Sequence, residues 1–391
     1  MKFVGSNWFK ILSCLTIVSM LTYYPLLKNS VKAQDRSSQW TGKAKNVVFF
    51  VGDGMGPGHR ELIRLMSVGP KGQIAMNDMP YTGFSITNST SIVTDSAAGA
   101  TAWASGVKSY NGAIGLDIDK KPVETVLEKA KKSGKATGIV TTSQVADATG
   151  AAFGAHVTSR ESKTEIAKQF LQNNKVDVIL GGGKADFVTN QVNLVNQAKN
   201  QGYTYVTNIN EMNKAEGSKI LGLFANEEMF IPGSESKGVY EPTVSLPDMT
   251  KKAINILSNN ESGFFLVVEE EGIDGMAHEN NAELTIKSGK QLNSAVEVAK
   301  KYAKTHPDTL IIVGADHETG GLAIEAKDKS LGDGPFLVPN TNQQVFVDWT
   351  TMKHTAVFVP ITAMGPGAEK LTGIYQNTHI HDVMVEAMNL K

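Results

Sequence analysis

Acidic and histidine side chains stand in spacings that suit metal binding at several points of this 391-residue chain. Asp53 and the adjacent pair Asp316-His317 each come directly after a short apolar run. Asp274 and His278 are four residues apart, which is one helical turn, so both can face a single ion. Histidine nitrogens and carboxylate oxygens are common zinc ligands. We therefore treat these residues as candidate metal ligands, although Asp53 alone would also suit a simple turn.

Oxygen-bearing side chains form a second candidate group. Three consecutive glutamates beginning at Glu269 end another apolar run, and they would repel one another unless cations or solvent neutralised them. Asp147 and Thr149 follow a further apolar run, and His354 precedes the last one. A solvated acidic loop and a structural histidine are the alternative interpretations of the glutamates and of His354.

Ser96 is the candidate nucleophile. It begins an Ala-rich stretch that predicts a helix, and a short β-type run precedes it. Free N–H groups and the positive end of the helix dipole favour an anion at such a start. This placement suits a serine that attacks phosphorus and then carries the phosphate, although a plain helix cap is the alternative.

Arg160 is a candidate phosphate ligand, because its planar guanidinium can bind two phosphate oxygens at once. A surface ion pair is the alternative for this residue. The glycine-rich segments do not predict nucleotide binding. Gly52 and Gly54 lack the third glycine of a dinucleotide fingerprint, and the segment from Gly181 to Lys184 lacks the spacing and the Ser or Thr of a P-loop.

The elements that must position these residues alternate along the chain. Short runs rich in Val and Ile predict buried parallel strands, and longer patterns between them predict helices. The predicted strands are Val47 to Val51, Thr137 to Thr141, Val176 to Leu180, Phe264 to Val268, Leu310 to Val313 and Ala356 to Ile361. The predicted helices are Val123 to Lys132, Glu161 to Asn173, Thr250 to Ser258 and Ala282 to Lys304.

This alternation predicts an α/β fold of three layers, in which helices flank a central, mostly parallel sheet. In such sheets the ligand site lies at the carboxyl ends of the strands, where the candidate residues stand. Residues 184–248 mix Asn, Gly and Pro with short apolar clusters, and residues 322–352 form an irregular stretch between two candidate segments. We expect both to be insertions that cover the sheet or the site.

The amino terminus has the pattern of a secretory signal peptide. Lys2 and Lys10 precede an apolar run from Ile11 to Leu27, and small residues suit cleavage after Ala33. Hydroxyl residues and a proline interrupt the run, so it does not predict a stable membrane anchor. We expect residues 1–33 to be removed, residues 34–391 to form one large domain, and the mature protein to be periplasmic or extracellular.

Composition narrows the classes of partner and ligand. Residues 1–33 hold four lysines and no acidic residue, so the remainder keeps 34 of the 38 basic residues beside 39 acidic ones, a formal charge of −5. This balance does not suggest a nucleic acid as a specific partner. The single cysteine, Cys14, lies in the same segment, so the mature protein is expected to have neither disulfides nor thiolate metal sites.

Together, the candidate segments resemble those of the alkaline phosphatase family and occur in the family's order. They are Gly52 to Gly56, Thr94 to Ala98, Asp147 to Thr149, His156 to Arg160, Glu269 to His278, Ala315 to Gly321 and His354-Thr355. The resemblance extends from about Lys45 to the end of the chain. It implies a metal-dependent phosphomonoester hydrolase that works at alkaline pH, binds two zinc ions and one magnesium ion, and acts on small phosphate esters. Many members of the family are homodimers.

The resemblance also implies a role for each matching residue. Ser96 would be the nucleophile that becomes phosphoserine, and Arg160 would bind two phosphate oxygens. One zinc would polarise the leaving oxygen, and the other would lower the pKa of the serine. The implied ligands are Asp274, His278 and His354 for the first zinc, Asp53, Asp316 and His317 for the second, and Thr149, Glu269 and a bridging Asp53 for magnesium, with Asp147 acting through water.

Gly275 departs from the family's pattern, because many members carry a Lys, His or aromatic residue there that reaches toward phosphate. The resemblance therefore does not fix the phosphate affinity or the optimum pH. Two alternatives to the monoesterase remain: a phosphodiesterase of the same superfamily, and a non-catalytic secreted protein that binds metal or phosphate.

Overall fold

A ten-stranded sheet runs through the part of the chain that the computed structural model describes, which is residues 40, 42–231, 238–326 and 332–391. The strand order is β15-β2-β14-β8-β1-β7-β3-β4-β6-β5. The strands are β1 (Asn46–Gly52), β2 (Tyr81–Ile86), β3 (Ala136–Gln144), β4 (Val178–Gly182), β5 (Thr204–Val206), β6 (Ile220–Leu223), β7 (Phe264–Glu270), β8 (Thr309–Gly314), β14 (Val359–Met364) and β15 (Gly373–Gln376). All neighbouring strands are parallel except at β14, which runs antiparallel to β2 and β8.

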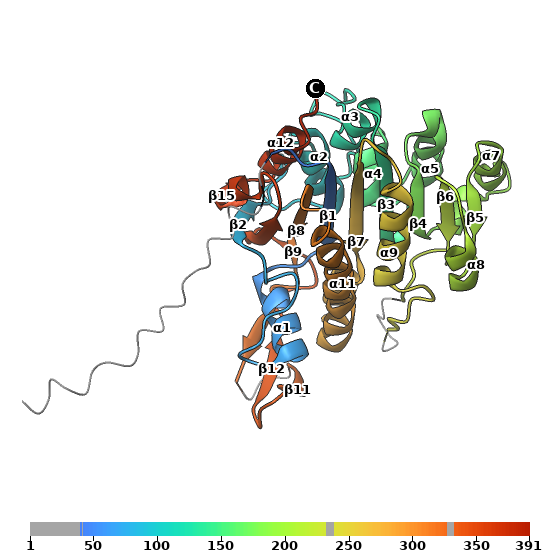
Figure 1. Cartoon of the computed structure of the whole chain (residues 1–391). Coiled ribbons are helices and arrows are strands. Elements are labelled where there is room, and N and C mark those ends of the chain that lie inside the picture. Colours follow the sequence, from blue (N-terminus) through green and yellow to red (C-terminus); the bar gives the residue numbers. More distant parts are fainter. Residues whose placement is uncertain (1–39, 41, 232–237, 327–331) are drawn as a thin grey trace, which may run out of the picture. The chain divides into compact units, whose positions relative to one another are not determined.

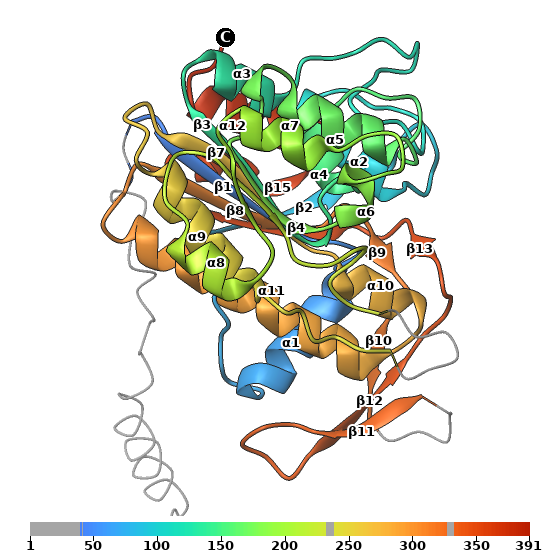
Figure 2. The same ribbon diagram turned by 90° about the vertical axis from the view of Figure 1, so that its right-hand side faces the viewer.

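Helices cover both faces of this sheet (Figure 1). One face carries α2 (Ser96–Ser105), α3 (Val126–Lys132), α4 (Ala148–Gly154), α5 (Lys163–Leu171), α6 (Lys184–Phe187), α7 (Leu194–Asn200) and α12 (Thr378–Ala387). The other carries α1 (Pro57–Val68), α8 (Ile209–Lys214), α9 (Leu246–Leu257), α10 (Gly272–His278) and α11 (Ala282–Ala303). Figure 2 shows the two helical layers on either side of the strands. The predicted three-layer α/β fold is confirmed.

The alternation of side chains along β1 explains why both faces are covered. Val47 and Phe49 pack in the core that contains α2, and Val48 and Phe50 pack in the core that contains α11. Successive side chains of a strand point to opposite faces, so a strand that is apolar throughout requires a layer on each side.

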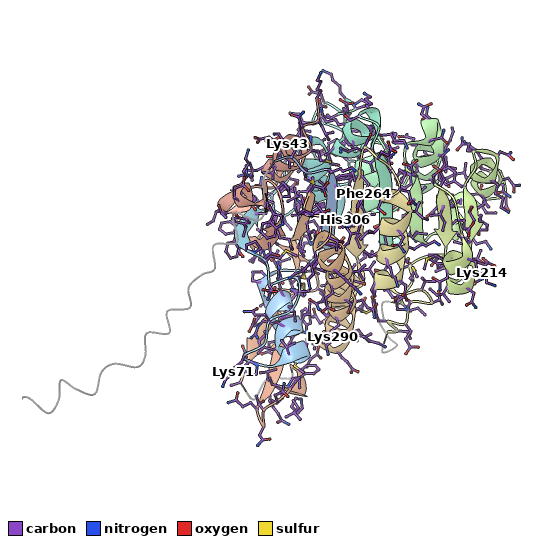
Figure 3. The ribbon with its side chains drawn as sticks, viewed as in Figure 1. Lys43, Lys71, Lys214, Phe264, Lys290 and His306 are labelled. Carbon is purple, nitrogen blue, oxygen red and sulfur yellow. The ribbon has the colours of Figure 1, made fainter. Side chains whose placement is uncertain are left out.

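The outer faces of the helices carry the charged residues. Lys214 on α8 and Lys290 on α11 are exposed, whereas Phe264 at the start of β7 is fully buried, and Figure 3 labels all three. Helices α8 and α11 therefore turn an apolar side to the sheet and a charged side outward, whereas α2 and α4 carry no charged residue and are buried throughout.

The last predicted strand differs from the structure in position and in direction. The sequence predicted a parallel strand from Ala356 to Ile361, but β14 begins at Val359 and is antiparallel to its neighbours. A short apolar run indicates burial and does not encode strand direction. Strand β2 and the edge strand β15 were not predicted, because several of their side chains are exposed and their runs are short.

Two helices begin where capping residues stand rather than where the apolar pattern begins. The predicted start of α3 was Val123, but Thr125 caps the helix: its hydroxyl accepts from the Glu128 N–H, and the Glu128 side chain accepts from the Thr125 N–H. Helix α9 begins at Leu246, before the predicted Thr250, because the Ser245 side chain caps it.

The two predicted insertions have more regular structure than the sequence suggested. Residues 184–248 contribute β5 and β6, which extend the main sheet at one edge instead of covering it. The described residues of the segment 322–352 include a three-stranded antiparallel sheet of β10 (Ala323–Glu325), β11 (Asp333–Leu337) and β12 (Gln344–Asp348). Its Val347 packs with Leu62 of α1 and Ile286 of α11.

The predicted signal peptide, residues 1–33, lies outside the described residues. Among the residues that are described, no helix combines the length and the apolar character that crossing a membrane would require.

Candidate active site

The candidate residues meet at the carboxyl ends of four neighbouring strands, β8, β1, β7 and β3. Asp53 follows β1, and Asp316 comes two residues after β8. Glu269 lies near the end of β7, and Asp147 stands between β3 and α4. The sequence placed these residues at one edge of the sheet, and the structure brings them together there.

The glycines after β1 allow other side chains to approach its end closely. Gly54 has φ +65°, and a Cβ atom on it would lie 2.6 Å from both Asp274 Oδ1 and Thr319 Oγ1. A Cβ atom on Gly56 would lie 2.0 Å from Cγ of Glu318. The glycines of the segment Gly52 to Gly56 are therefore explained by close packing at the site, and not by nucleotide binding.

Asp274, His278 and His354 form one half of the site. The first two lie on α10, and His354 lies on β13 (His354–Thr355), which pairs with β9 (Glu318–Thr319). The Nε2 atom of His278 lies 3.1 Å from Asp274 Oδ2 and 3.1 Å from Nε2 of His354. The Nε2 atom of His354 lies 3.7 Å from Asp274 Oδ1. Residues far apart in sequence thus present three ligand atoms to one point.

The tautomers of the two histidines follow from their other contacts. Nδ1 of His278 lies 2.8 Å from the Met352 carbonyl oxygen, and Nδ1 of His354 lies 3.0 Å from that of Thr94. A carbonyl oxygen can only accept, so each Nδ1 carries the hydrogen. Both Nε2 atoms then present lone pairs to each other, and an ion or proton between them is required to hold them at 3.1 Å.

Asp53, Asp316 and His317 form the other half. Nε2 of His317 lies 3.1 Å from Asp316 Oδ2 and 3.5 Å from Asp53 Oδ1. These two oxygens are buried and have no hydrogen-bond partner among the described residues. The second oxygen of Asp316 is held by the N–H groups of Gly54 and His317. The imidazole of His317 faces both of these buried carboxylate oxygens, and a cation would offset the remaining cost of their burial.

Thr319 joins the two halves. Its hydroxyl donates to Asp274 Oδ1 and lies 3.2 Å from Nδ1 of His317. The rings of His317 and His354 are stacked with centroids 3.5 Å apart. The ligand atoms of Asp274, His317 and His354 lie within 4.8 Å of one another, as do those of Asp53, Asp316 and His317. We call the six predicted residues together the histidine–carboxylate cluster: Asp53, Asp274, His278, Asp316, His317 and His354.

The charges in this cluster perturb its pKa values in both directions. Burial, with the charges of Asp316 and Asp274, raises the pKa of Asp53 well above its ordinary value. Burial would also raise the pKa of Asp274, but the contact with His278 and the charge of His317 bring it below the ordinary value. The hydrogen bond with Asp274 raises the pKa of His278 to about 9. In the metal-free protein, a proton on His278 therefore provides positive charge beside Asp274, whereas burial and the charge of His317 lower the pKa of His354.

Ser96 is the first residue of α2 and is 5% exposed. The preceding Asp95 caps the helix by accepting from the Ala98 N–H at 3.0 Å. The hydroxyl oxygen of Ser96 lies 3.3 Å from Nε2 of His317. The predicted serine is therefore at the helix start, beside the histidine–carboxylate cluster, where the helix dipole favours an anion.

Thr149 and Glu269, two members of the predicted oxygen-bearing group, lie deeper and are buried. The Thr141 hydroxyl donates to Glu269 Oε2 at 2.6 Å. Burial raises the pKa of Glu269 to about 7, against the opposing effect of the hydroxyls of Thr141 and Thr149.

Asp147 and Arg160 contact each other. Nη2 of Arg160 lies 2.9 Å from Asp147 Oδ2, and its Nη1 lies 3.8 Å from Asp95 Oδ2. Nζ of Lys163 is 3.4 Å from the other oxygen of Asp147. An ion pair was the alternative interpretation of Arg160, although the sequence did not identify its partners. Arg160 is thereby oriented between two carboxylates close to Ser96.

The position after Asp274 carries no side chain, and an aromatic ring covers it. A Cβ atom on Gly275 would lie 2.9 Å from Cε2 of Phe230, which packs with Tyr240 and Met276. The ring leaves no room for a Cβ atom at this position, which explains why the residue is glycine. No sequence pattern indicated this contact.

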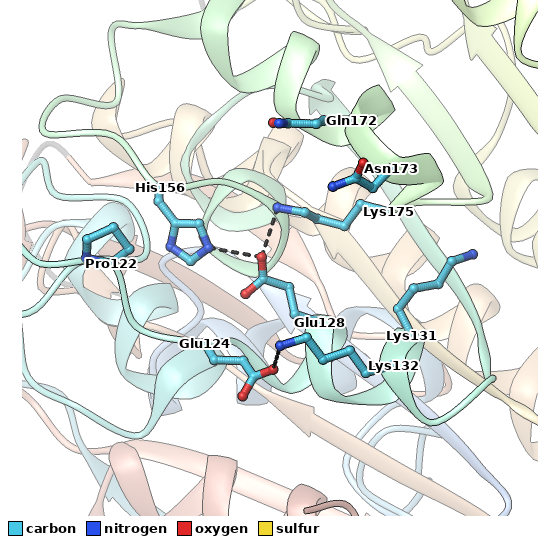
Figure 4. A pocket seen from close by; sticks show the side chains of 9 residues that line it. All are labelled: Pro122, Glu124, Glu128, Lys131, Lys132, His156, Gln172, Asn173 and Lys175. Atoms are coloured by element: carbon cyan, nitrogen blue, oxygen red, sulfur yellow. Dashed lines mark hydrogen bonds and ion pairs between the residues drawn. The ribbon is translucent and has the colours of Figure 1, made fainter.

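A separate hollow of about 430 Å³ lies away from the cluster, against α3 and the 3₁₀ helix η2 (Gln172–Asn174). In Figure 4, Glu128 contacts His156 at 3.0 Å and Lys175 at 2.8 Å, and Glu124 contacts Lys132. Lys131, the remaining charged residue of the hollow, pairs with Asp177. None of the residues that line it belongs to the predicted site.

A parallel α/β sheet with imidazole and carboxylate ligands gathered around a serine at a helix start defines the class of metal-dependent hydrolases. Comparison with known proteins gives the family. The family profile described as Alkaline phosphatase matches residues 44–339. Alkaline phosphatase 4 of Bacillus subtilis (strain 168) is 34% identical, with 90% of this chain and 89% of that protein aligned. Alkaline phosphatase of Escherichia coli (strain K12) is also 34% identical, with 89% and 87% aligned.

Solved structures agree. A TAB5 alkaline phosphatase mutant with Mg bound in the M3 site superposes with a TM-score of 0.77 at 30% identity, over 89% of this chain and 99% of that one. The chain belongs to the alkaline phosphatase family.

Proposed function

We propose that the protein hydrolyses phosphate monoesters at alkaline pH through a phosphoserine formed on Ser96, with two zinc ions and one magnesium ion. As a family member the chain is a phosphomonoester hydrolase, and its relatives point to metal dependence. The observation that carries the finer proposal is the convergence of six ligand side chains from four parts of the sequence beside the Ser96 hydroxyl.

The donor atoms suit the proposed ions. Nitrogen and carboxylate donors in the histidine–carboxylate cluster match zinc, and the facing lone pairs and unpaired carboxylate oxygens there call for cations. Asp274, His278 and His354 would hold one zinc, and Asp53, Asp316 and His317 the other. The oxygens of Thr149, Glu269, Asp53 and Asp147 suit magnesium, which prefers oxygen ligands. Bound in this way, the ions would supply positive charge to the entering and leaving oxygens.

The side chains of the chain itself account for binding and orientation. Arg160 would bind two phosphate oxygens, since Asp147 and Asp95 already hold its guanidinium near Ser96. The Oγ atom of Ser96 would form a bond to phosphorus while the ester P–O bond breaks and the alcohol leaves. Water would then break the Oγ–P bond, which releases inorganic phosphate and restores the serine. The helix start at α2 favours the anionic phosphate throughout.

A matched pair of serine variants tests this mechanism. Ser96→Ala is expected to lower kcat/KM for p-nitrophenyl phosphate by at least a few hundredfold, because the nucleophile is lost. Ser105→Ala makes the same change at the other end of α2, where the hydroxyl only donates to the Thr101 carbonyl, and is expected to keep activity within about twofold. After a reaction with labelled phosphate is quenched in acid, wild type and Ser105→Ala should carry the label, and Ser96→Ala should not.

Two results would contradict the proposal. Full activity in Ser96→Ala would remove the covalent step. Faster turnover of bis-p-nitrophenyl phosphate than of the monoester would favour a phosphodiesterase.

We also propose that residues 1–33 direct export and are cleaved after Ala33. The supporting pattern is a basic start followed by an apolar run and small residues. Amino-terminal sequencing of the protein recovered outside the cytoplasm should begin at Gln34, and an intact Met1 on that protein would contradict the proposal.

A further inference from the structure

Glu270 is a buried charged residue of the site to which the proposed mechanism gives no role. It lies at the end of β7, next to Glu269, and is 0% exposed. Its Oε1 atom accepts from the Thr142 hydroxyl at 2.8 Å and from the Gly272 N–H at 3.1 Å, and its Oε2 atom accepts from the Tyr240 hydroxyl at 2.5 Å. The carboxylate therefore joins three segments: the end of β3, the start of α10 and the segment that contains Tyr240.

Tyr240 belongs to the insertion that contributes β5 and β6, and it contacts α10 with its ring as well. A Cβ atom on Gly272 would lie 2.7 Å from Cε2 of Tyr240. The ring packs with Phe230 and with Met276, which is fully buried. The ring of Phe230 in turn covers Gly275. Two aromatic side chains of the insertion therefore pack against α10.

This aromatic packing lies on the face of α10 opposite the metal ligands. Gly275 and Met276 come three and four residues after Gly272, so these three residues share one face of the helix. Asp274 and His278 are four apart and share another face. Asp274 is two residues from both Gly272 and Met276, and two residues correspond to a rotation of about 200° along a helix. The contacts on the far face of α10 therefore set where its two ligand side chains reach.

We propose that Tyr240 is a positioning residue for the first zinc site. Through the Glu270 carboxylate it fixes the start of α10, and thereby the two ligands that this helix carries, Asp274 and His278. The proposal rests on the proposed function, because it presumes that these two residues and His354 bind zinc. Metal–ligand distances tolerate only about 0.2 Å, so a small shift of α10 weakens the site. The second zinc site has no ligand on α10 and keeps its affinity.

A matched pair of tyrosine variants tests this role. Tyr240→Phe keeps the ring and removes the hydroxyl, so the buried Glu270 carboxylate loses a donor. Tyr203→Phe makes the same change at another buried tyrosine of the insertion, whose hydroxyl donates to the Val176 carbonyl. Val176 precedes β4, at the edge of the sheet opposite the site, so this variant reports the loss of a tyrosine hydrogen bond away from the metal ligands.

The test measures zinc binding at each site. Zinc content is determined by mass spectrometry after dialysis against buffers of fixed free zinc, and Tyr203→Phe is expected to fill both sites as wild type does. Tyr240→Phe is expected to need at least tenfold more free zinc to fill one site only. Anomalous diffraction from its crystals at intermediate free zinc should show the depleted site among Asp274, His278 and His354. Saturating zinc should restore kcat/KM to within about twofold, because mass action offsets the weaker affinity.

Glu270→Gln gives an independent result should Tyr240→Phe fold poorly, because its amide presents an NH₂ group where a carboxylate oxygen accepted. It is expected to show the same loss at one site. Zinc affinity equal to wild type in the folded variants would overturn the proposal. Equal loss from both zinc sites, or the same loss in Tyr203→Phe, would also overturn it, because the hydroxyl would then support the fold in general. Wild-type protein that binds no zinc would instead contradict the proposed function.

Discussion

Replacement of Gly54 by Ala should disrupt the site through a single methyl group. The new Cβ would stand 2.6 Å from Asp274 Oδ1 and 2.6 Å from Thr319 Oγ1, whereas ordinary contact begins at 3.4 Å. Each of these atoms must therefore move by about 0.8 Å. Metal–ligand distances tolerate only about 0.2 Å, so Asp274 could not keep its place as a ligand. We expect zinc affinity to fall by about 10- to 100-fold or more.

The left-handed backbone of Gly54 adds a separate cost, which a control variant isolates. At φ +65° an alanine costs roughly 1 to 2 kcal/mol relative to glycine. Gly202 has φ +86°, and a Cβ atom on it would meet no other atom within 4 Å, so Gly202→Ala carries the backbone cost without the clash. In the metal-free state Gly54→Ala should lose at least as much stability as Gly202→Ala, because it carries the clash in addition to the backbone cost, and only Gly54→Ala should lose zinc affinity.

The assay is competition for zinc against a chelator of known affinity, followed by activity at limiting zinc. Gly202→Ala should match wild type in both measurements. Gly54→Ala should need at least tenfold more free zinc for half-maximal activity. Equal zinc affinity in Gly54→Ala and Gly202→Ala would refute the reasoning, because the methyl group would then be accommodated without displacing Asp274.

Individual contacts and titrating groups support three further predictions. Thr319→Val removes the hydroxyl that donates to Asp274, so chelator competition should show about 10-fold weaker zinc binding, and unchanged binding would contradict that role. Arg160→Lys loses the contact of the guanidinium with two phosphate oxygens, so steady-state kinetics should show KM raised by about tenfold and kcat changed less. An unchanged KM would exclude Arg160 from phosphate binding. Metal-free protein should lose stability as pH rises from about 5 to 9, because the pKa values of Glu269, Glu270 and His278 are raised to about 7, 8 and 9. All three groups bind protons more tightly when folded, so rising pH favours the unfolded chain; urea unfolding in a chelator should show this fall, and a rise would contradict it.

Residue types at strand ends made most of the site predictable. A carboxylate or histidine directly after a buried run lies at the same edge as its counterparts on neighbouring strands, so Asp53, Glu269 and Asp316 could be grouped from the sequence alone. The helix start at Ser96 was predictable because Ala-rich sequence follows a capping residue.

Contacts between distant segments could not be read from the sequence. Thr319 bridges Asp274 and His317, yet a threonine after a strand is unremarkable on its own. Phe230 covers Gly275 although the two are far apart in sequence, and no local pattern encodes that contact. The direction of β14 depends in the same way on which strands it pairs with, and short apolar runs do not carry that information.

The central claim is that residues from Asp53 to His354 hold two metal ions beside the Ser96 hydroxyl. Anomalous diffraction at the zinc edge from crystals of zinc-loaded protein tests it directly. We predict two peaks about 4 Å apart, one among Asp274, His278 and His354 and the other among Asp53, Asp316 and His317. A single peak, or peaks away from Ser96, would contradict the account.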